Sequence, residues 1–163
     1  MRLRRFAPYG AILLVSVLLD QAIKALVEAN LPLHEKVDIL PFLALLHSRN
    51  TGVAFSFLSG VDGLWLSFLV LGIIVFIAVL AARTDATQLL ARLGFVLIIG
   101  GAIGNLIDRA LRGFVVDYVY FHTPGWSFAI FNLADAFITI GAALVILEEV
   151  LHWRRGKKAE ERR

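Results

Sequence analysis

The chain has 163 residues, of which 59% are apolar and 18% are charged, and it contains no cysteine. Soluble domains are about 45–50% apolar and about 25% charged, so the composition excludes an ordinary soluble domain, and its apolar richness also excludes intrinsic disorder. The net charge of +3 does not indicate a nucleic-acid partner, because the basic residues gather at the chain ends beside apolar segments. The composition predicts one integral membrane domain, residues 1–163, without disulfides or cysteine-ligated metals.

Four apolar stretches are long enough to cross a bilayer, which needs about 20 residues of helix. They comprise residues 7–27, 64–82, 89–107 and 128–151. The first follows a basic N-terminus and so resembles a secretory signal peptide. Its apolar run continues past Asp20 toward Val27, and no small-residue cleavage site follows. We therefore expect an uncleaved first helix.

The basic residues predict how the chain threads the membrane. With the N-terminus in the cytoplasm, eleven Lys and Arg lie on the inner side, and four lie on the outer side, namely Lys36, Arg49, Arg109 and Arg112. Cytoplasmic segments carry the excess of basic residues in membrane proteins, so both termini are expected in the cytoplasm. Residues 152–163 then form a basic cytoplasmic tail, in which GKKAEERR (156–163) is expected to be disordered, and residues 28–63 form an outer segment.

The outer connections contain strand-like and aromatic sequences. Residues 37–46 and 53–58 are apolar, β-branched or aromatic pieces on either side of the turn signal Asn50-Thr51-Gly52, which predicts short strands on the membrane surface. The amides of this turn are alternatively available to bind a substrate backbone. Residues 114–127 contain Tyr118, Tyr120, Phe121, His122 and Trp126, and aromatic side chains of this kind favour the membrane interface.

Polar side chains gather at the outer ends of three spans. They are Asp20, Lys24, Asn105, Asp108, Arg109, Asn132 and Asp135, with Asp117 in the link before the fourth span. An ionisable group inside a membrane is costly and therefore marks a functional or pairing site. The expected topology places all of these side chains in one layer near the outer face.

Two of these residues, Asp117 in VVDY and Asp135 in LADAFI, are flanked by apolar residues. Two carboxylates close together in low dielectric share a proton, so one activates a water while the other polarises a carbonyl. This is the chemistry of aspartic proteases, and the sequence has no motif for a serine, cysteine or zinc peptidase. Spacing alone favours a structural alternative, in which Asp117 caps a turn and Asp135 pairs with Arg109 or Lys24.

The remaining polar residues also have structural alternatives. Asp20 and Lys24 are spaced i,i+4 and are expected to form an ion pair on one helix face. Asp108 and Arg109 can simply anchor a helix end at the interface. Asn105 and Asn132 can either lock the bundle or orient a carboxylate. Gly100, Gly101 and Gly104 predict a face for close helix contact, and the histidines lack the spacing of a metal site.

Membrane-embedded acids also suit a small proton-coupled transporter. Transporters usually place their site near the midplane and show repeat symmetry. This sequence places its acids at one end of the spans and shows no internal repeat. The residues alone leave the choice between an enzyme and a transporter open.

Five segments occur in chain order, namely LDQAIK (19–24), NTGVAFSF (50–57), GGAIGNLIDR (100–109), VVDY (115–118) and FNLADAFI (131–138). In this order and spacing they resemble the lipoprotein signal peptidase family, bacterial signal peptidase II. The resemblance covers the chain from about Pro8 to Leu151. It implies an all-α integral membrane fold with four transmembrane helices, a small outer β-cradle and a short outer helical element between the last two spans.

The resemblance also implies a function. Such a protein is an intramembrane aspartic endopeptidase of the bacterial inner membrane that removes signal peptides from diacylglyceryl-modified prolipoproteins, cutting before the lipidated cysteine. By motif, Asp117 and Asp135 are the implied catalytic residues. The implied substrate-binding and supporting residues are Asn50, Asn105, Arg109, Asn132, Asp20 and Lys24. We expect no cofactor or metal, a monomer, an active site toward the outer face, and inhibition by cyclic peptide antibiotics such as globomycin.

Overall fold

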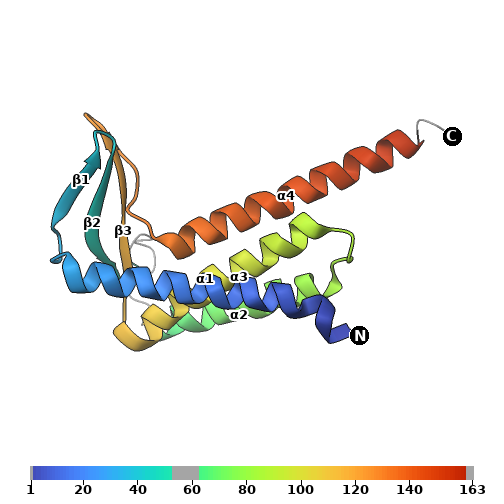
Figure 1. Cartoon of the computed structure of the whole chain (residues 1–163), viewed down its shortest axis with the longest axis horizontal. Helices are drawn as coiled ribbons and strands as arrows, with labels where there is room; N and C mark the ends of the chain where they lie inside the picture. The colour runs from blue at the N-terminus through green and yellow to red at the C-terminus, as the bar shows by residue number, and fades with distance from the viewer. Residues whose placement is uncertain (1, 53–62, 161–163) are drawn as a thin grey trace.

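The computed structural model describes residues 2–52 and 63–160. Within these ranges the chain forms four helices and four strands, in the order α1 (Arg2–Asn30), β1 (Lys36–Leu40), β2 (Leu43–Asn50), α2 (Gly63–Arg83), α3 (Leu89–Arg112), β3 (Val115–Thr123), β4 (Trp126–Ser127) and α4 (Leu133–Glu160). The strands stand at one end of the helices, and the start of α1 and the end of α4 lie at the other end (Figure 1). The helices and the sheet are therefore arranged as two adjoining layers, with the sheet across one end.

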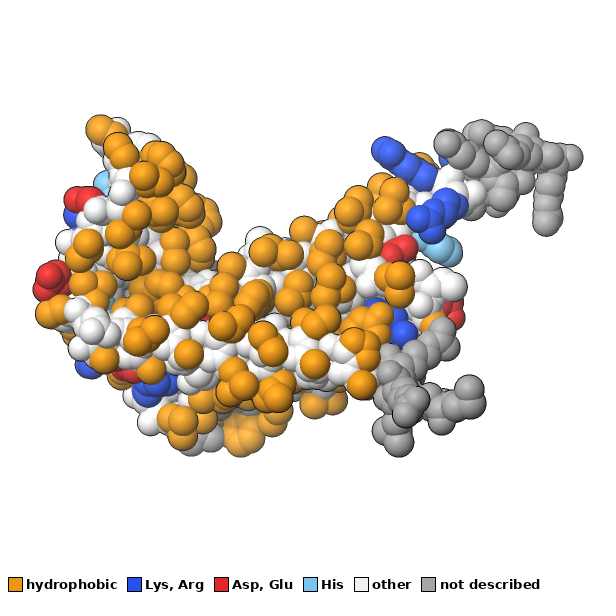
Figure 2. All heavy atoms as spheres, in the orientation of Figure 1, with side chains coloured by type: hydrophobic (Ala, Val, Ile, Leu, Met, Phe, Trp, Pro, Cys, Tyr) orange, Lys and Arg blue, Asp and Glu red, His pale blue; other side chains and the backbone are white. Residues whose placement is uncertain are grey.

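Three of the helices are long and apolar enough to cross a membrane. Their candidate spans are Ala7–Asn30, Trp65–Arg83 and Leu89–Arg112, which agree with the first three predicted spans. Apolar side chains cover the visible face of the helices, while charged side chains gather toward the two ends of the molecule (Figure 2). This distribution is typical of a lipid-facing helical surface. Membrane crossing by the fourth predicted span stays a prediction.

The prediction for the fourth helix was wrong at both ends. The span was expected over residues 128–151, but α4 begins at Leu133. The preceding chain is extended, because the backbone N–H and O of Phe131 both bond to Val119 of β3. At the other end, the helix continues to Glu160 and so includes residues 156–160 of the segment that was expected to be disordered, since Lys, Glu and Ala are strong helix formers. Residues 161–163 of that segment lie outside the described residues.

Helix α3 is the centre of the helical layer, since it packs against α1, α2 and α4. Its glycines permit this close approach. A Cβ on Gly101 would overlap the backbone oxygen of Ala134 in α4, and a Cβ on Gly104 would overlap the Asp20 carboxylate in α1. The predicted small-residue face is thus confirmed, and it brings polar groups of α1 and α4 against α3.

The sheet is antiparallel and has the order β1-β2-β3-β4. The β1–β2 hairpin confirms the strands predicted within residues 37–46; the second predicted piece, residues 53–58, lies outside the described residues. Strand β2 also pairs with β3, with Ser48 opposite Asp117. The pairing of β2 with β3 therefore places this part of the outer segment beside Asp117.

The short helical element implied between the last two spans is not what the structure has. Residues 115–123 form strand β3 instead, because the run VVDYVYFHT is dominated by β-branched and aromatic residues, which favour strands. Tyr118, one of the aromatic residues of this segment, is buried in an apolar cluster with Val27, Leu31 and Val116. This cluster fixes the sheet on the end of α1.

The glycine face makes a prediction about stability. Gly101→Leu should lower the free energy of unfolding by about 1–3 kcal/mol, because the new side chain overpacks the α3–α4 contact. The matched control is Gly72→Leu in α2, where nothing lies within 4 Å of an added Cβ. Thermal unfolding of the detergent-solubilised protein measures both. Equal midpoints for the two variants would contradict the assigned role of Gly101.

Candidate active site

The site is built on a buried ion cluster around Lys24 of α1. The Lys24 Nζ lies 2.8 Å from Asp20 Oδ2 and 2.9 Å from Asp108 Oδ2, and it donates a hydrogen bond of 2.9 Å to Asn105 Oδ1. Each proton of the ammonium group therefore has an acceptor. Asp20, Lys24 and Asp108 are fully buried. The predicted Asp20–Lys24 pair is confirmed, whereas Asp108 lies inside the cluster and is not a surface anchor.

The two aspartates of this cluster also hold two backbone segments. Asp20 Oδ1 accepts a hydrogen bond of 3.0 Å from the backbone N–H of Ala134 in α4. Asp108 Oδ2 accepts one of 3.2 Å from the backbone N–H of Val116 in β3. Asp135 directly follows Ala134, and Asp117 directly follows Val116. The cluster thus fixes the main chain next to both predicted catalytic residues.

Three further residues complete the cluster. Asp108 Oδ1 accepts hydrogen bonds from Arg112 at 2.7 Å and Gln21 at 3.0 Å, and Arg112 also pairs with Glu28 at 3.0 Å. The sequence analysis missed the roles of Gln21, Glu28 and Arg112. Helical spacing could have indicated these roles, because Gln21, Lys24 and Glu28 lie on one face of α1. Arg112 likewise lies four residues after Asp108, on the same face of α3.

Asp135 is held by a capping box at the start of α4. Its backbone N–H donates to Asn132 Oδ1 at 3.0 Å, and its Oδ2 accepts from the Asn132 backbone N–H at 3.2 Å. This reciprocal pair satisfies two N–H groups that a helix start otherwise leaves unpaired. The other carboxylate oxygen accepts a hydrogen bond of 2.8 Å from Asn105 Nδ2. Asp135 therefore has a fixed orientation set by α3 and α4.

Asp117 lies on β3 between two asparagine side chains. Its Oδ1 accepts from Asn132 Nδ2 at 2.6 Å, and its Oδ2 accepts from Asn50 Nδ2 at 3.0 Å. Asn50 is itself held in a turn, because Gly52, with φ +87°, donates its N–H to Asn50 Oδ1 at 2.9 Å. Asn132 thus bonds to both aspartates, and the predicted turn at Asn50 also orients a carboxylate.

These contacts differ from the structural alternative that was expected for the two aspartates. Asp117 bonds to side-chain amides rather than capping a turn. Among the described residues, no Lys or Arg nitrogen lies within 4.0 Å of the Asp135 carboxylate, so it does not form the alternative ion pair with Arg109 or Lys24. Asn105 and Asn132 both lock the elements together and orient the carboxylates.

The environment of Asp117 favours its protonated form. Burial, together with the nearby negative charge of Asp135, raises the pKa of Asp117 to about 6, against the opposing hydrogen bonds from Asn50 and Asn132. Burial also raises the pKa of the neighbouring Tyr118 to about 12, so its hydroxyl stays neutral. That hydroxyl accepts a hydrogen bond of 3.2 Å from the Leu133 backbone N–H and further fixes the start of α4.

Arg109 is connected to the site differently from the other predicted residues. The other predicted residues form one hydrogen-bonded network, which comprises Asp20, Lys24, Asn50, Asn105, Asp117, Asn132 and Asp135. Arg109 contacts that network through the Asn105 backbone oxygen, which its Nη1 reaches at 3.4 Å. Its Nε is buried without a hydrogen-bond partner in the described part of the chain. The guanidinium therefore has a donor, Nε–H, that none of the described residues uses.

The two carboxylates give the site groups that can exchange protons. Across residues 2–52 and 63–160, no group of three or more His, Cys, Asp or Glu is arranged to hold a metal ion. The two carboxylates share Asn132 as a neighbour, and one of them titrates close to neutral pH. This arrangement can hold a proton on one carboxyl group and accept a second proton on the other.

Comparisons with known proteins agree over most of the chain. The family described as "Signal peptidase (SPase) II" matches residues 12–151. A lipoprotein signal peptidase of Mesorhizobium japonicum is 53% identical over 153 residues, which cover 94% of this chain and 91% of the relative. One from Brucella ovis is 52% identical over 155 residues, covering 94% and 97%.

Two solved structures, both described as bacterial membrane enzymes obtained by the in meso method, have the same fold. The first, at 1.9 Å resolution, superposes with a TM-score of 0.77 at 31% identity and covers 86% of this chain and 91% of its own. The second, at 2.3 Å, gives a TM-score of 0.73 at 30% identity, with 88% of each chain covered.

The ion cluster makes a second prediction. Lys24→Met should destabilise the folded protein by about 3–5 kcal/mol, because it leaves Asp20 and Asp108 buried without their shared cation. The control is Lys36→Met, whose ion pair with Asp38 is exposed and should leave the unfolding midpoint almost unchanged. Thermal unfolding in detergent compares them. If the two variants melt alike, the cluster does not hold the site together.

Proposed function

The chain belongs to the signal peptidase II family and is a bacterial membrane peptidase that removes signal peptides from lipoproteins, and we propose that it does so as an aspartic endopeptidase with Asp117 and Asp135 as catalytic residues. The observation that carries this proposal is the bond of Asn132 to both carboxylates, combined with the raised pKa of Asp117. Family membership supports cleavage and does not support the alternative of a proton-coupled transporter.

In the proposed mechanism the two carboxyl groups hold one proton between them. The ionised group accepts a proton from a water, whose oxygen attacks the scissile carbonyl carbon, while the protonated group donates its proton to the carbonyl oxygen. The tetrahedral intermediate then collapses as its hydroxyl proton returns to a carboxylate and the leaving nitrogen receives a proton from the other carboxyl group. Asp117 and Asp135 thus alternate as base and acid.

The supporting residues have separate tasks in this proposal. Asn50, Asn105 and Asn132 donate hydrogen bonds that orient the carboxylates, and Asp20 and Lys24 fix the backbone beneath them. Arg109 has a buried Nε–H without a partner in the described residues, which is suited to bind an oxygen of the substrate. The bond cut is the one before the diacylglyceryl-modified cysteine of a prolipoprotein.

The proposed setting is the bacterial inner membrane, with both termini in the cytoplasm and the site toward the outer face. The excess of basic residues on the side of the termini supports this orientation. The sheet at the opposite end carries exposed aromatic side chains, Trp126 at 60% and Phe128 at 53% exposure, as expected at a membrane interface. We also propose that the enzyme acts as a monomer and that cyclic peptides such as globomycin inhibit it.

The catalytic assignment is tested by substitution. Asp117→Asn and Asp135→Asn should each lower kcat by about 10²–10⁴-fold, because each removes a group that transfers a proton. Asp38→Asn, at an exposed acid on the same sheet, should keep normal activity. Cleavage of a diacylglyceryl-modified prolipoprotein by the purified enzyme is the measurement, with thermal unfolding to show that each variant is folded. Near-normal cleavage by either folded site variant contradicts its catalytic role.

The pH dependence supplies an independent test. Because burial raises the pKa of Asp117 to about 6, its protonated fraction falls as pH rises through that value, and kcat/KM should fall by up to about tenfold per pH unit above it. Asn50→Ala removes a hydrogen bond that stabilises the ionised form, so it should move this decline to higher pH. A decline that stays in place in Asn50→Ala, or none between pH 5 and pH 8, contradicts the assignment.

A further inference from the structure

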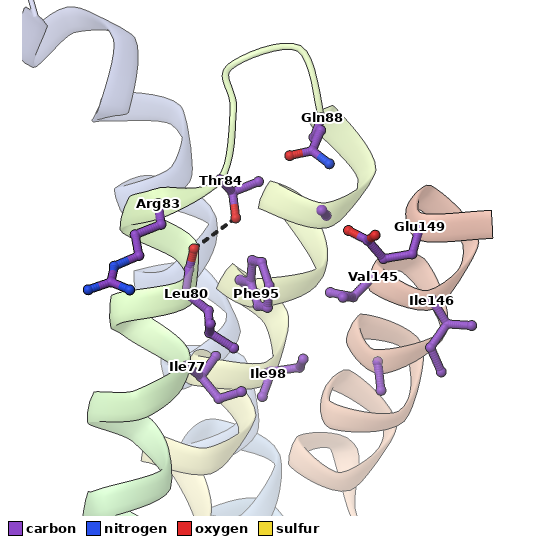
Figure 3. Close-up of a pocket in the computed structure, with 12 residues that line it drawn as sticks. Ile77, Leu80, Arg83, Thr84, Gln88, Phe95, Ile98, Val145, Ile146 and Glu149 are labelled. Carbon is purple, nitrogen blue, oxygen red and sulfur yellow. Dashed lines mark hydrogen bonds between the residues drawn. The ribbon is translucent and has the colours of Figure 1, made fainter. Parts of the chain in front are cut away.

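Two apolar grooves lie at the end of the helical layer away from the sheet, on neighbouring faces of α3. The first opens between α2 and α4, and Ala91, Phe95 and Ile98 line it from α3 (Figure 3). The second opens between α1 and α2, and Arg92 and Val96 line it from α3. Residues four apart share a face of a helix, so positions 91 and 95 face one groove and positions 92 and 96 face the other.

The first groove carries both signs of charge. Arg83 of α2 and Glu149 of α4 both line it, together with the polar residues Thr84 and Gln88. Figure 3 shows these four side chains toward the upper part of the groove. A cation and an anion at one place favour neither an anionic nor a cationic ligand, so charge does not select an occupant for this groove.

The lining of the second groove carries positive charge only. It consists, among the described residues, of Tyr9 of α1, Ala81 and Ala82 of α2, and Arg92 and Val96 of α3, around a volume of about 250 Å³. The Arg92 guanidinium carbon lies 5.4 Å from the centre of the Tyr9 ring, and an aromatic face attracts a cation at this distance. Tyr9 therefore helps to hold the positive charge at the groove.

The residues around the second groove are also mainly basic. Arg83 is the last residue of α2 and directly follows Ala82, and the sequence of α1 begins with Arg2-Leu3-Arg4-Arg5. Asp85 lies in the loop after α2, and Glu149 lines the first groove, so neither is among the described residues that line the second. The second groove is therefore a basic pocket between three membrane helices.

We propose that the second groove binds an anionic phospholipid of the cytoplasmic leaflet, with the phosphate at Arg92 and an acyl chain along Val96 and the two alanines. Basic pockets between membrane helices on the cytoplasmic side are typical sites for anionic lipid headgroups. Tyr9 suits the same level, because tyrosine favours the membrane interface. The choice of leaflet rests on the proposed orientation of the termini, and the site itself does not depend on the catalytic assignment.

Size and charge distinguish this ligand from other occupants. An α-helix with its side chains is about 10 Å across, so about 3 Å of its length would fill a volume of this size. A thinner acyl chain extends much further in the same space. A zwitterionic lipid carries a cationic amine beside its phosphate, and Arg92 repels that amine. An anionic phospholipid therefore complements both the narrow apolar surface and the positive charge.

Lipid binding to the full-length enzyme, purified in detergent, tests the inference. Phosphatidylglycerol and phosphatidylcholine with identical acyl chains are offered together, and native mass spectrometry measures the ratio retained. The wild type should favour phosphatidylglycerol, and Arg92→Gln should lower this preference about fivefold, as expected for one basic residue near an anionic lipid. Arg92→Lys keeps the charge and should keep most of the preference. Arg155→Gln, at an exposed residue of α4 outside the groove, should leave it unchanged.

Several outcomes overturn the proposed site. They are equal retention of both lipids by the wild type, the same preference in Arg92→Gln as in the wild type, and an equal loss of preference in Arg155→Gln, which would make overall positive charge responsible. Displacement of the lipid by inorganic phosphate also overturns it, because a ligand without acyl chains would then suffice. Thermal unfolding shows that each variant is folded.

Filling the groove tests the seat of the acyl chain without changing any charge. Ala82 lines the groove, whereas Ala143 is exposed on α4 and is not among the described residues that line it. Ala82→Trp should lower the retained phosphatidylglycerol several-fold, and Ala143→Trp should leave it unchanged. If both variants retain as much of this lipid as the wild type, the groove does not hold its acyl chain.

Discussion

The structure depends on the neutralisation of two buried aspartates by one lysine. Lys24 binds Asp20 and Asp108 inside the protein, where ionised groups without partners are strongly destabilising. Each aspartate also holds a backbone N–H: Asp20 binds that of Ala134 in α4 with its other oxygen, and Asp108 binds that of Val116 in β3 with the same oxygen that contacts Lys24. The same ion cluster that joins α1 to α3 therefore fixes the two segments that carry Asp135 and Asp117.

Two asparagines connect the ion cluster to the two carboxylates through hydrogen bonds. Asn105 accepts a hydrogen bond from Lys24 and donates one to Asp135, while Asn132 starts α4 and donates to Asp117. Side-chain amides suit this place, because they both donate and accept without adding charge. Asp117 consequently stays buried beside a second acid, and its raised pKa follows from that burial. Preorganisation of this kind is how a membrane enzyme can keep a reactive pair of acids in a fixed geometry.

Local features were predictable from the sequence, whereas contacts between distant segments were not. Runs of about 20 apolar residues predicted the first three spans, and i,i+4 spacing predicted the Asp20–Lys24 pair. The start of α4 at Leu133 was missed, although Asn132 and Asp135 have the spacing of a capping box. Strand β3 was also missed, although VVDYVYFHT has the composition of a strand. The expected topology placed these polar residues in one layer, but the bonds of Asp108 to Lys24 and to Val116 depend on how α1, α3 and β3 pack and were not predictable.

The central claim is that this packing raises the pKa of Asp117 to about 6, with Asp135 as the nearby second acid. The most direct measurement is a pH titration of the folded enzyme by infrared difference spectroscopy, which follows the carbonyl band of a protonated carboxyl group, with Asp117→Asn as the reference. The account predicts a band that titrates near pH 6 and is missing from the variant. A band for Asp117 that disappears near its ordinary value of about 4 would contradict it.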